Sequence, residues 1–167
     1  NPAEALTPEG AERDLGGRRY LVVQETPPGN GGGIYASAGS TLQVTQSEFY
    51  TNTSSFAGGG ISNLGTFTLT HSLLHGNTAL QVGGGVYNHW SNATLNDVTF
   101  RHNEATRGGG MYNSGWDGVS NPTLIDVVFD RNVVSSDGGG LYSSGYNGES
   151  SPTLTRVTFS GNAAQHG

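Results

Sequence analysis

The side chains most suited to chemistry recur at one position of successive repeats, in the column Gln46, His71, Asp97, Asp126 and Arg156. If this column stacks in space, two carboxylates lie side by side with an arginine next to them. Such a group could hold calcium or remove a proton from a substrate. Calcium, however, takes six or more oxygen ligands. We therefore expect no cofactor, with calcium at Asp97 and Asp126 as the alternative, and a turn-forming role for most of the column.

Aromatic residues form the second group of candidates. A tyrosine follows the aliphatic residue after a glycine triplet in four repeats, and Ser62 replaces it in one: Tyr35, Tyr87, Tyr112 and Tyr142. An exposed row of aromatic rings can stack on sugars or anchor a protein partner. With the aromatic residues of the adjacent segments, the predicted ligand-binding residues are Tyr87, Trp90, Tyr112, Trp116, Tyr142 and Tyr146. The alternative is that the tyrosines stack on one another and the loop aromatics fold over them.

The elements that position these residues form a repeat of 25 to 30 residues. Each unit opens with a glycine triplet, and the triplets begin at Gly31, Gly58, Gly83, Gly108 and Gly138. Each unit closes with an asparagine three positions after an apolar residue, and these asparagines are Asn52, Asn77, Asn103, Asn132 and Asn162. A period of this size indicates a solenoid, whose units gain stability by stacking. Asparagine tolerates left-handed turns and its amides can bond along a stack, so we predict a structural asparagine ladder.

Apolar and polar residues alternate in three short stretches of each unit. In the unit that starts at Gly83, Val86 marks the first stretch, Leu95 the second and Phe100 the third. This alternation predicts β-strands with one buried face. Three strands and three corners per coil give an all-β fold, a right-handed parallel β-helix of about five coils. A hydrophobic content of 33% suits the narrow core of such a solenoid better than a globular core.

The sequence divides into residues 1–30, an N-terminal arm with a capping strand, and residues 31–167, the β-helix repeats. One helical turn is expected around Glu9 to Leu15. The segment from Arg19 to Gln24 is a strand candidate, which we predict to cap the first coil or to form a degenerate coil. The repeat is predicted to be incomplete at its C-terminal end, because residue 167 falls where the next glycine triplet is due.

Charge and composition argue against several classes of function. The net charge is −6, and the seven basic residues are arginines scattered along the chain, so we expect no nucleic-acid partner. The absence of cysteine excludes disulfides and zinc–thiolate sites. No apolar run has the length of a membrane span, so we expect none in this chain.

The stretches GGGVYN, TLNDVTF and FRHN within residues 83–103 resemble the repeats of polymorphic outer membrane proteins and related bacterial secreted or surface proteins. The resemblance extends over residues 31–167. It implies an exported, adhesin-like parallel β-helix, and it brings no catalytic motif with it. The location that it implies is extracellular or on a bacterial cell surface.

The function predicted from these observations is that of a non-catalytic structural or adhesin-like solenoid, with other protein chains or surface glycans as partners. One alternative is a carbohydrate-binding module or a polysaccharide lyase, in which carboxylates hold calcium and Arg156 acts as base. Fold-level analogy is a weak basis for such a mechanism. Another alternative is a fibre subunit, because the last coil of one chain could pair end to end with the first coil or arm of the next.

Overall fold

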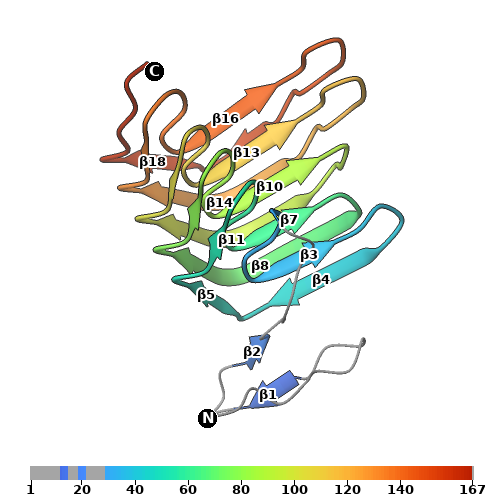
Figure 1. The fold of residues 1–167 in the computed structure, drawn as a ribbon. Coiled ribbons are helices and arrows are strands. Elements are labelled where there is room, and N and C mark those ends of the chain that lie inside the picture. The colour runs from blue at the N-terminus through green and yellow to red at the C-terminus, as the bar shows by residue number, and fades with distance from the viewer. Residues whose placement is uncertain (1–11, 15–18, 22–28, 167) are drawn as a thin grey trace.

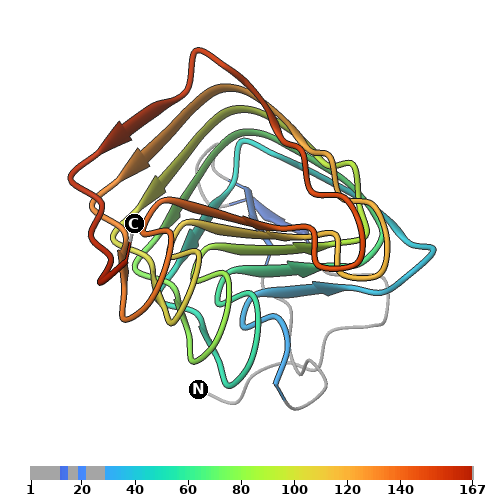
Figure 2. The same cartoon turned by 90° about the horizontal axis from the view of Figure 1, so that it is seen from above.

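The computed structural model of this chain describes residues 12–14, 19–21 and 29–166. Within these residues every helix or strand element is a β-strand. Residues 29–166 wind into five stacked coils, and their strands pair in parallel with those of the coils before and after (Figure 1). Seen along the stack, the coils superpose with loops that project at the corners (Figure 2). The predicted all-β parallel solenoid of about five coils is confirmed.

The first sheet contains the strands that follow the glycine triplets. They are β3 (Ile34–Ala36), β7 (Ile61–Asn63), β10 (Val86–His89), β13 (Met111–Ser114) and β16 (Leu141–Ser144). Equivalent residues of neighbouring repeats lie opposite each other, as Val86 does with Ile61 and Met111. The repeat spacing in the sequence therefore sets the register of the sheet.

The second sheet is the longest. Its strands are β4 (Thr41–Thr45), β5 (Glu48–Tyr50), β8 (Thr66–His75), β11 (Thr94–Arg101), β14 (Thr123–Asp130), β17 (Thr153–Thr155) and β18 (Thr158–Ser160). The second and third predicted stretches merge here into single strands in the three middle coils. The reason is that the residue between them, such as Asp97 with φ of 54°, bends the strand while the parallel ladder continues on both sides.

A third sheet of two-residue strands follows the asparagine column. Its strands are β6 (Thr53–Ser54), β9 (Thr78–Ala79), β12 (Glu104–Ala105) and β15 (Val133–Val134). This sheet is absent from the sequence prediction, because two residues carry no detectable alternation. Ala79, Ala105 and Val134 form a small apolar cluster of their own beneath it.

The main core is a column of aliphatic and phenylalanine side chains between the first two sheets. Its largest fully buried members are Ile61, Phe67, Leu69, Leu74, Val86, Leu95, Val98, Phe100, Met111, Leu124, Val127 and Phe129. The rings of Phe100 and Phe129 stack with centroids 4.9 Å apart and planes at 7°. Each fully buried side chain contributes about 1.5–3 kcal/mol, so the stacking of coils supplies most of the stability.

The glycine triplets serve close approach between coils. A Cβ on Gly84 would lie 2.5 Å from the carbonyl oxygens of Glu104 and Gly109. Backbone atoms cannot move aside at such a distance without breaking the ladder. The close packing of backbone at these corners therefore requires glycine.

Near the N-terminus, β1 (Glu12–Asp14) and β2 (Arg19–Leu21) pair antiparallel in a separate two-stranded sheet. The strand expected from Arg19 to Gln24 is confirmed for its first half, and residues 22–24 lie outside the described residues. The helical turn predicted around Glu9 to Leu15 is wrong for Glu12–Asp14, because these residues pair with β2 as a strand. The capping role of this segment stays a prediction.

Candidate functional site

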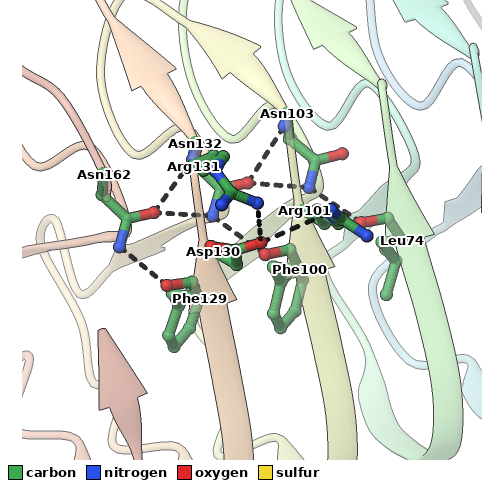
Figure 3. Close-up of polar contacts among 9 residues, drawn as sticks. All are labelled: Leu74, Phe100, Arg101, Asn103, Phe129, Asp130, Arg131, Asn132 and Asn162. Atoms are coloured by element: carbon green, nitrogen blue, oxygen red, sulfur yellow. Dashed lines mark hydrogen bonds and ion pairs between the residues drawn. The ribbon is translucent and has the colours of Figure 1, made fainter. Parts of the chain in front are cut away.

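The asparagine column forms the predicted ladder. The side-chain Nδ2 of Asn103 donates to Oδ1 of Asn132 at 3.0 Å and to the Leu74 carbonyl oxygen at 2.9 Å. Its Oδ1 in turn accepts from the backbone and side-chain N–H groups of Asn77, each at 3.0 Å. Figure 3 shows the same pattern continuing to Asn162, whose Nδ2 donates to the Phe129 carbonyl oxygen at 2.8 Å. The ladder binds coil to coil, and its side chains are occupied by structural hydrogen bonds.

The left-handed backbone at this corner does not belong to the asparagines themselves. The preceding residues adopt it, with φ between 51° and 62°: Thr51, Gly76, His102, Arg131 and Gly161. The explanation that asparagine is chosen for left-handed geometry is therefore wrong. The asparagines are buried for their amide groups, which satisfy carbonyl and N–H groups of neighbouring coils.

A second buried asparagine column, which the sequence analysis missed, lies at the opposite end of the first sheet. Nδ2 of Asn63 donates to Oδ1 of Asn88 at 2.9 Å, and Nδ2 of Asn88 donates to Oδ1 of Asn113 at 2.8 Å. Each is fully buried. The sequence pattern that could have predicted this column is an asparagine two positions after the buried apolar residue in three successive repeats, as in Val86-Tyr87-Asn88.

This second column anchors the long corner loops, residues 115–122 and 145–152. The buried hydroxyl of Ser120 donates to Oδ1 of Asn113 at 2.7 Å, and Nδ2 of Asn113 donates to Oγ of Ser150 at 2.8 Å. The two loops also pair through their backbones, since the Glu149 N–H donates to the Gly118 carbonyl oxygen at 2.8 Å. They therefore stack in register as extensions of the coils, and Figure 1 shows the loops that follow β13 and β16 one above the other.

We call Trp90 and these two loops the corner ridge. Its aromatic side chains are exposed: 55% of Trp90, 51% of Trp116 and 60% of Tyr146. The rings of Trp116 and Tyr146 lie 4.9 Å apart at an angle of 46°. Trp90 stacks on His89 with centroids 4.3 Å apart, and its indole N–H donates to the Trp116 carbonyl oxygen. The loop aromatics thus form one contiguous, solvent-facing row on successive coils.

The tyrosine column lies on the first sheet and is more enclosed. Tyr112 is buried, while Tyr35, Tyr87 and Tyr142 are half-buried. Tyr112 packs against Tyr87 and Tyr142 with ring centroids 5.8 and 5.0 Å apart. Burial raises the pKa of Tyr87 and Tyr112 above the usual value. Of the predicted ligand-binding residues, those of the loops therefore offer far more surface than the tyrosines on the sheet.

Ser62 occupies the gap in the tyrosine column and is fully buried. Its hydroxyl has no hydrogen-bond partner among the described residues.

The corner column of Gln46, His71, Asp97, Asp126 and Arg156 stacks as predicted, and all five residues have φ between 48° and 54°. Arg156 donates from Nε and Nη2 to the Asp126 carboxylate at 2.6 and 2.7 Å. These hydrogen bonds lower the pKa of Asp126 and raise that of Arg156. A raised arginine pKa is the opposite of what a general base requires.

Calcium at Asp97 and Asp126 stays a prediction. The Asp97 carboxylate lies 4.0 Å from Nε2 of His71, and that of Asp126 faces Arg156. In the part of the chain that the structure describes, no three His, Asp or Glu side chains converge on a metal site.

The remaining arginines of residues 29–166 pair with carboxylates on other parts of the surface. Figure 3 shows Asp130 between Arg101 and Arg131, at 3.2 and 3.1 Å. Arg107 pairs with Asp137 at 3.1 Å. Together with the Asp126–Arg156 pair, these contacts give each of the four arginines of residues 29–166 a carboxylate partner.

On the corner ridge the charged groups are of one sign. The two long loops carry Asp117 and Glu149 and no basic residue. Both carboxylates belong to exposed residues. Glu149 accepts a hydrogen bond from Nδ2 of Asn121 at 2.8 Å, whereas Asp117 makes no ion pair with a described residue. The ridge therefore joins aromatic surface to negative charge that no ion pair within residues 29–166 neutralises.

His89 lies beneath the Trp90 ring, and its Nδ1 is 3.0 Å from the hydroxyl oxygen of Ser114. Desolvation by burial lowers the pKa of His89 below its ordinary value, and a hydrogen bond to Ser114 opposes this in part. His89 is thus a neutral, aromatic support for Trp90 at neutral pH.

Part of the chain is similar to a known repeat family. Residues 126–144 match the profile of the Chlamydia polymorphic membrane protein repeat. The matched segment runs from the corner at Asp126 through most of β14 and all of β15 to the end of β16, so it spans one passage between coils. No curated protein and no solved structure matches the chain. Among the described residues there is also no helix long and apolar enough to span a membrane. The repeat is thus similar to that of the chlamydial polymorphic membrane proteins, and it folds as a β-solenoid.

Proposed function

We propose that this chain is a non-catalytic, surface-associated β-solenoid that acts as an adhesin through its corner ridge. The similarity to the polymorphic membrane protein repeat supports a location on a bacterial cell surface or outside the cell. The observation that carries the adhesive role is the exposure of Trp90, Trp116 and Tyr146 on a rigid corner. Exposed aromatic residues on an anchored platform are typical binding anchors, because little conformational entropy is lost when a partner docks.

The absence of catalysis is part of the proposal. A lyase would need a proton-accepting arginine, but Arg156 is held by two hydrogen bonds to Asp126 that favour its charged form. The Asp126 and Arg156 side chains also lie on an open corner with 44% and 66% exposure, where water is not excluded. If acidic polysaccharides incubated with the protein and calcium develop the ultraviolet absorbance of unsaturated products, and Asp126→Ala abolishes it, the chain is a lyase.

The adhesive role is tested by displaying the solenoid on a bacterium that does not normally adhere. Cells are washed over surfaces coated with glycans or with extracellular proteins, and the bound cells are counted. We expect adhesion that falls severalfold in the Trp116→Ala and Tyr146→Ala variants. Phe56→Ala is the matched control, since Phe56 is 43% exposed and lies near the start of the third sheet, away from the ridge. Equal adhesion by the parent, the ridge variants and cells without the solenoid refutes the proposal.

Carbohydrate binding is the nearest alternative, since Trp and Tyr rings also stack on sugars. In this ridge, however, His89 covers one face of the Trp90 ring, and the Trp116 and Tyr146 rings contact each other at an angle of 46°. A glycan array separates the two: a defined glycan bound by the parent and lost in Trp90→Ala and Trp116→Ala would establish the sugar function.

End-to-end association is a second candidate, favoured by the C-terminal face of the fifth coil. Leu154 and Phe159 are 44% and 50% exposed there, whereas the equivalent Leu124 and Phe129 are fully buried by the next coil. A coil of matching sequence from another molecule would cover these side chains and pair with β16, β17 and β18. Sedimentation velocity over a hundredfold concentration range tests this. A constant monomeric sedimentation coefficient would remove end-to-end association from consideration.

A further inference from the structure

We infer that the partner of the corner ridge is a cationic, arginine-bearing segment of another protein. The inference rests on the proposed adhesive function and names the chemistry of its partner. Its first support is the isolated negative charge of the ridge. Asp117 and Glu149 are the charged residues of the two long loops, and both are exposed.

The second support is that the arginines of residues 29–166 are engaged elsewhere. Arg101 and Arg131 pair with Asp130, and Arg107 pairs with Asp137. The fourth arginine of residues 29–166, Arg156, is held by Asp126. A ridge carboxylate is therefore available to a cation from outside, and a partner would find no positive charge on the ridge to repel it.

The third support is the combination of carboxylates with exposed aromatic rings. Asp117 directly follows Trp116, and its backbone N–H donates to the carbonyl oxygen of Tyr146 at 3.0 Å. A guanidinium can pair with a carboxylate while lying within about 6 Å of an aromatic centroid. The Trp116 and Tyr146 rings meet at 46°, so part of each face stays open to such a group.

The ridge is also held in one shape before any partner arrives. Nδ2 of Asn88 donates to the Ser91 carbonyl oxygen at 2.7 Å and to Oγ of Ser120 at 3.0 Å, and Asn113 continues this buried network. Gly118 packs against the Trp90 ring, where a Cβ would lie 2.7 Å from Cδ1 of the indole. A rigid platform of this kind keeps its aromatic rings and carboxylates at fixed spacing, which suits an extended peptide with basic residues at regular intervals.

The inference is tested by fluorescence anisotropy with labelled peptides that alternate arginine with serine. The control peptide has citrulline, the neutral isostere, in place of arginine. We expect the arginine peptide to bind at least tenfold more tightly than the citrulline peptide, with affinity that falls as salt is raised from about 50 to 500 mM. Asp117→Asn and Trp116→Ala should each weaken binding about two- to fivefold, in line with exposed ion pairs and cation–π contacts.

The matched controls are Glu104→Gln and Tyr50→Ala, an exposed acid and an exposed aromatic residue away from the ridge, and both should bind as the parent does. Circular dichroism melting of every variant shows whether the solenoid is intact. Equal binding of the citrulline peptide, or no loss in Asp117→Asn, would overturn the inference. If cells that display the solenoid then still adhere through Trp116 and Tyr146, the adhesive function stands and only the inference of a cationic partner is wrong.

Discussion

Replacing Asn103 by alanine tests whether the asparagine ladder carries the stability that its geometry indicates. The substitution removes two hydrogen bonds that Nδ2 donates, to Asn132 and to the Leu74 carbonyl oxygen, and two that Oδ1 accepts from Asn77. Asn77 keeps a side-chain partner in the Phe49 carbonyl oxygen. The Asn77 backbone N–H and the Leu74 carbonyl, however, lose the partners supplied by Asn103, in a region without solvent access.

The magnitude follows from these two backbone groups. A hydrogen bond contributes about 1 kcal/mol net, and leaving a buried polar group unpaired costs about 1–3 kcal/mol. We therefore expect Asn103→Ala to lower the free energy of unfolding by about 3–5 kcal/mol. Asn162 makes the same kind of contacts but is only half-buried, so water can replace its amide. For Asn162→Ala the expected loss is about 1–2 kcal/mol.

Urea denaturation followed by far-ultraviolet circular dichroism measures both values, and equal m-values show that the same cooperative unit unfolds. Asn92→Ala is a control for a surface asparagine, since Asn92 is exposed and accepts one hydrogen bond, from the Asn121 backbone N–H. Its substitution should change stability by less than about 1 kcal/mol. If Asn103→Ala costs no more than Asn162→Ala, the buried ladder is not the stabilising element described above.

Three further predictions follow from packing and ionisation. In Gly85→Ala the new Cβ would lie 2.5 Å from the Gly110 carbonyl oxygen and 2.8 Å from Cδ1 of Phe100. We therefore expect the free energy of unfolding to fall by about 3 kcal/mol or more, or the variant not to fold. Thermal melting measures this, and a variant as stable as the parent would contradict it. Phe129→Ala should lower the free energy of unfolding by about 3–5 kcal/mol, because Phe129 is fully buried. Phe159→Ala should lower it by less than half as much, because Phe159 is 50% exposed. Equal losses in urea denaturation would show that the end coil is covered in solution. The pKa of His89, measured by NMR, should lie below the unfolded value of about 6.5 because burial disfavours the charged ring. As the pH drops below about 6.5, His89 therefore binds a proton in the unfolded state before it does so in the folded state. The free energy of unfolding should fall until the pH reaches the pKa of His89 in the folded protein, and His89→Asn should remove this dependence.

The solenoid could be predicted from the sequence because its determinants are local and repeated. The spacing of the glycine triplets and of the phenylalanines can be read directly from the sequence. When the coils stack, residues one repeat apart become partners in the sheet, as Phe100 and Phe129 do. For the aromatic residues the sequence left two interpretations open, an exposed row or stacked tyrosines covered by the loop aromatics. In the structure the tyrosines of the first sheet do contact one another, while Trp90, Trp116 and Tyr146 are exposed.

The polar interior could not be predicted in the same way. Asn88 and Asn113 occupy inward positions that alternation assigns to apolar residues. Their burial depends on carbonyl oxygens of the loop that follows in the same coil and on amide and hydroxyl groups of the next coil. The column is three asparagines deep, with Ala36 and Ser143 at the same place in the outer coils, so its period is weak in the sequence. The ion pair between Asp130 and Arg101 was missed for a similar reason, because it joins one coil to the next through side chains of different types.

The two asparagine columns explain how a chain with 33% hydrophobic residues keeps a rigid ridge. A loop of serine, glycine and asparagine offers little apolar surface, so hydrophobic burial cannot hold it in place. Asn113 and Ser120 supply the missing fixation through buried hydrogen bonds that engage the loop backbone and leave its outer side chains free. Trp116 and Asp117 therefore remain exposed on a fixed corner, as the proposed contact with a partner requires.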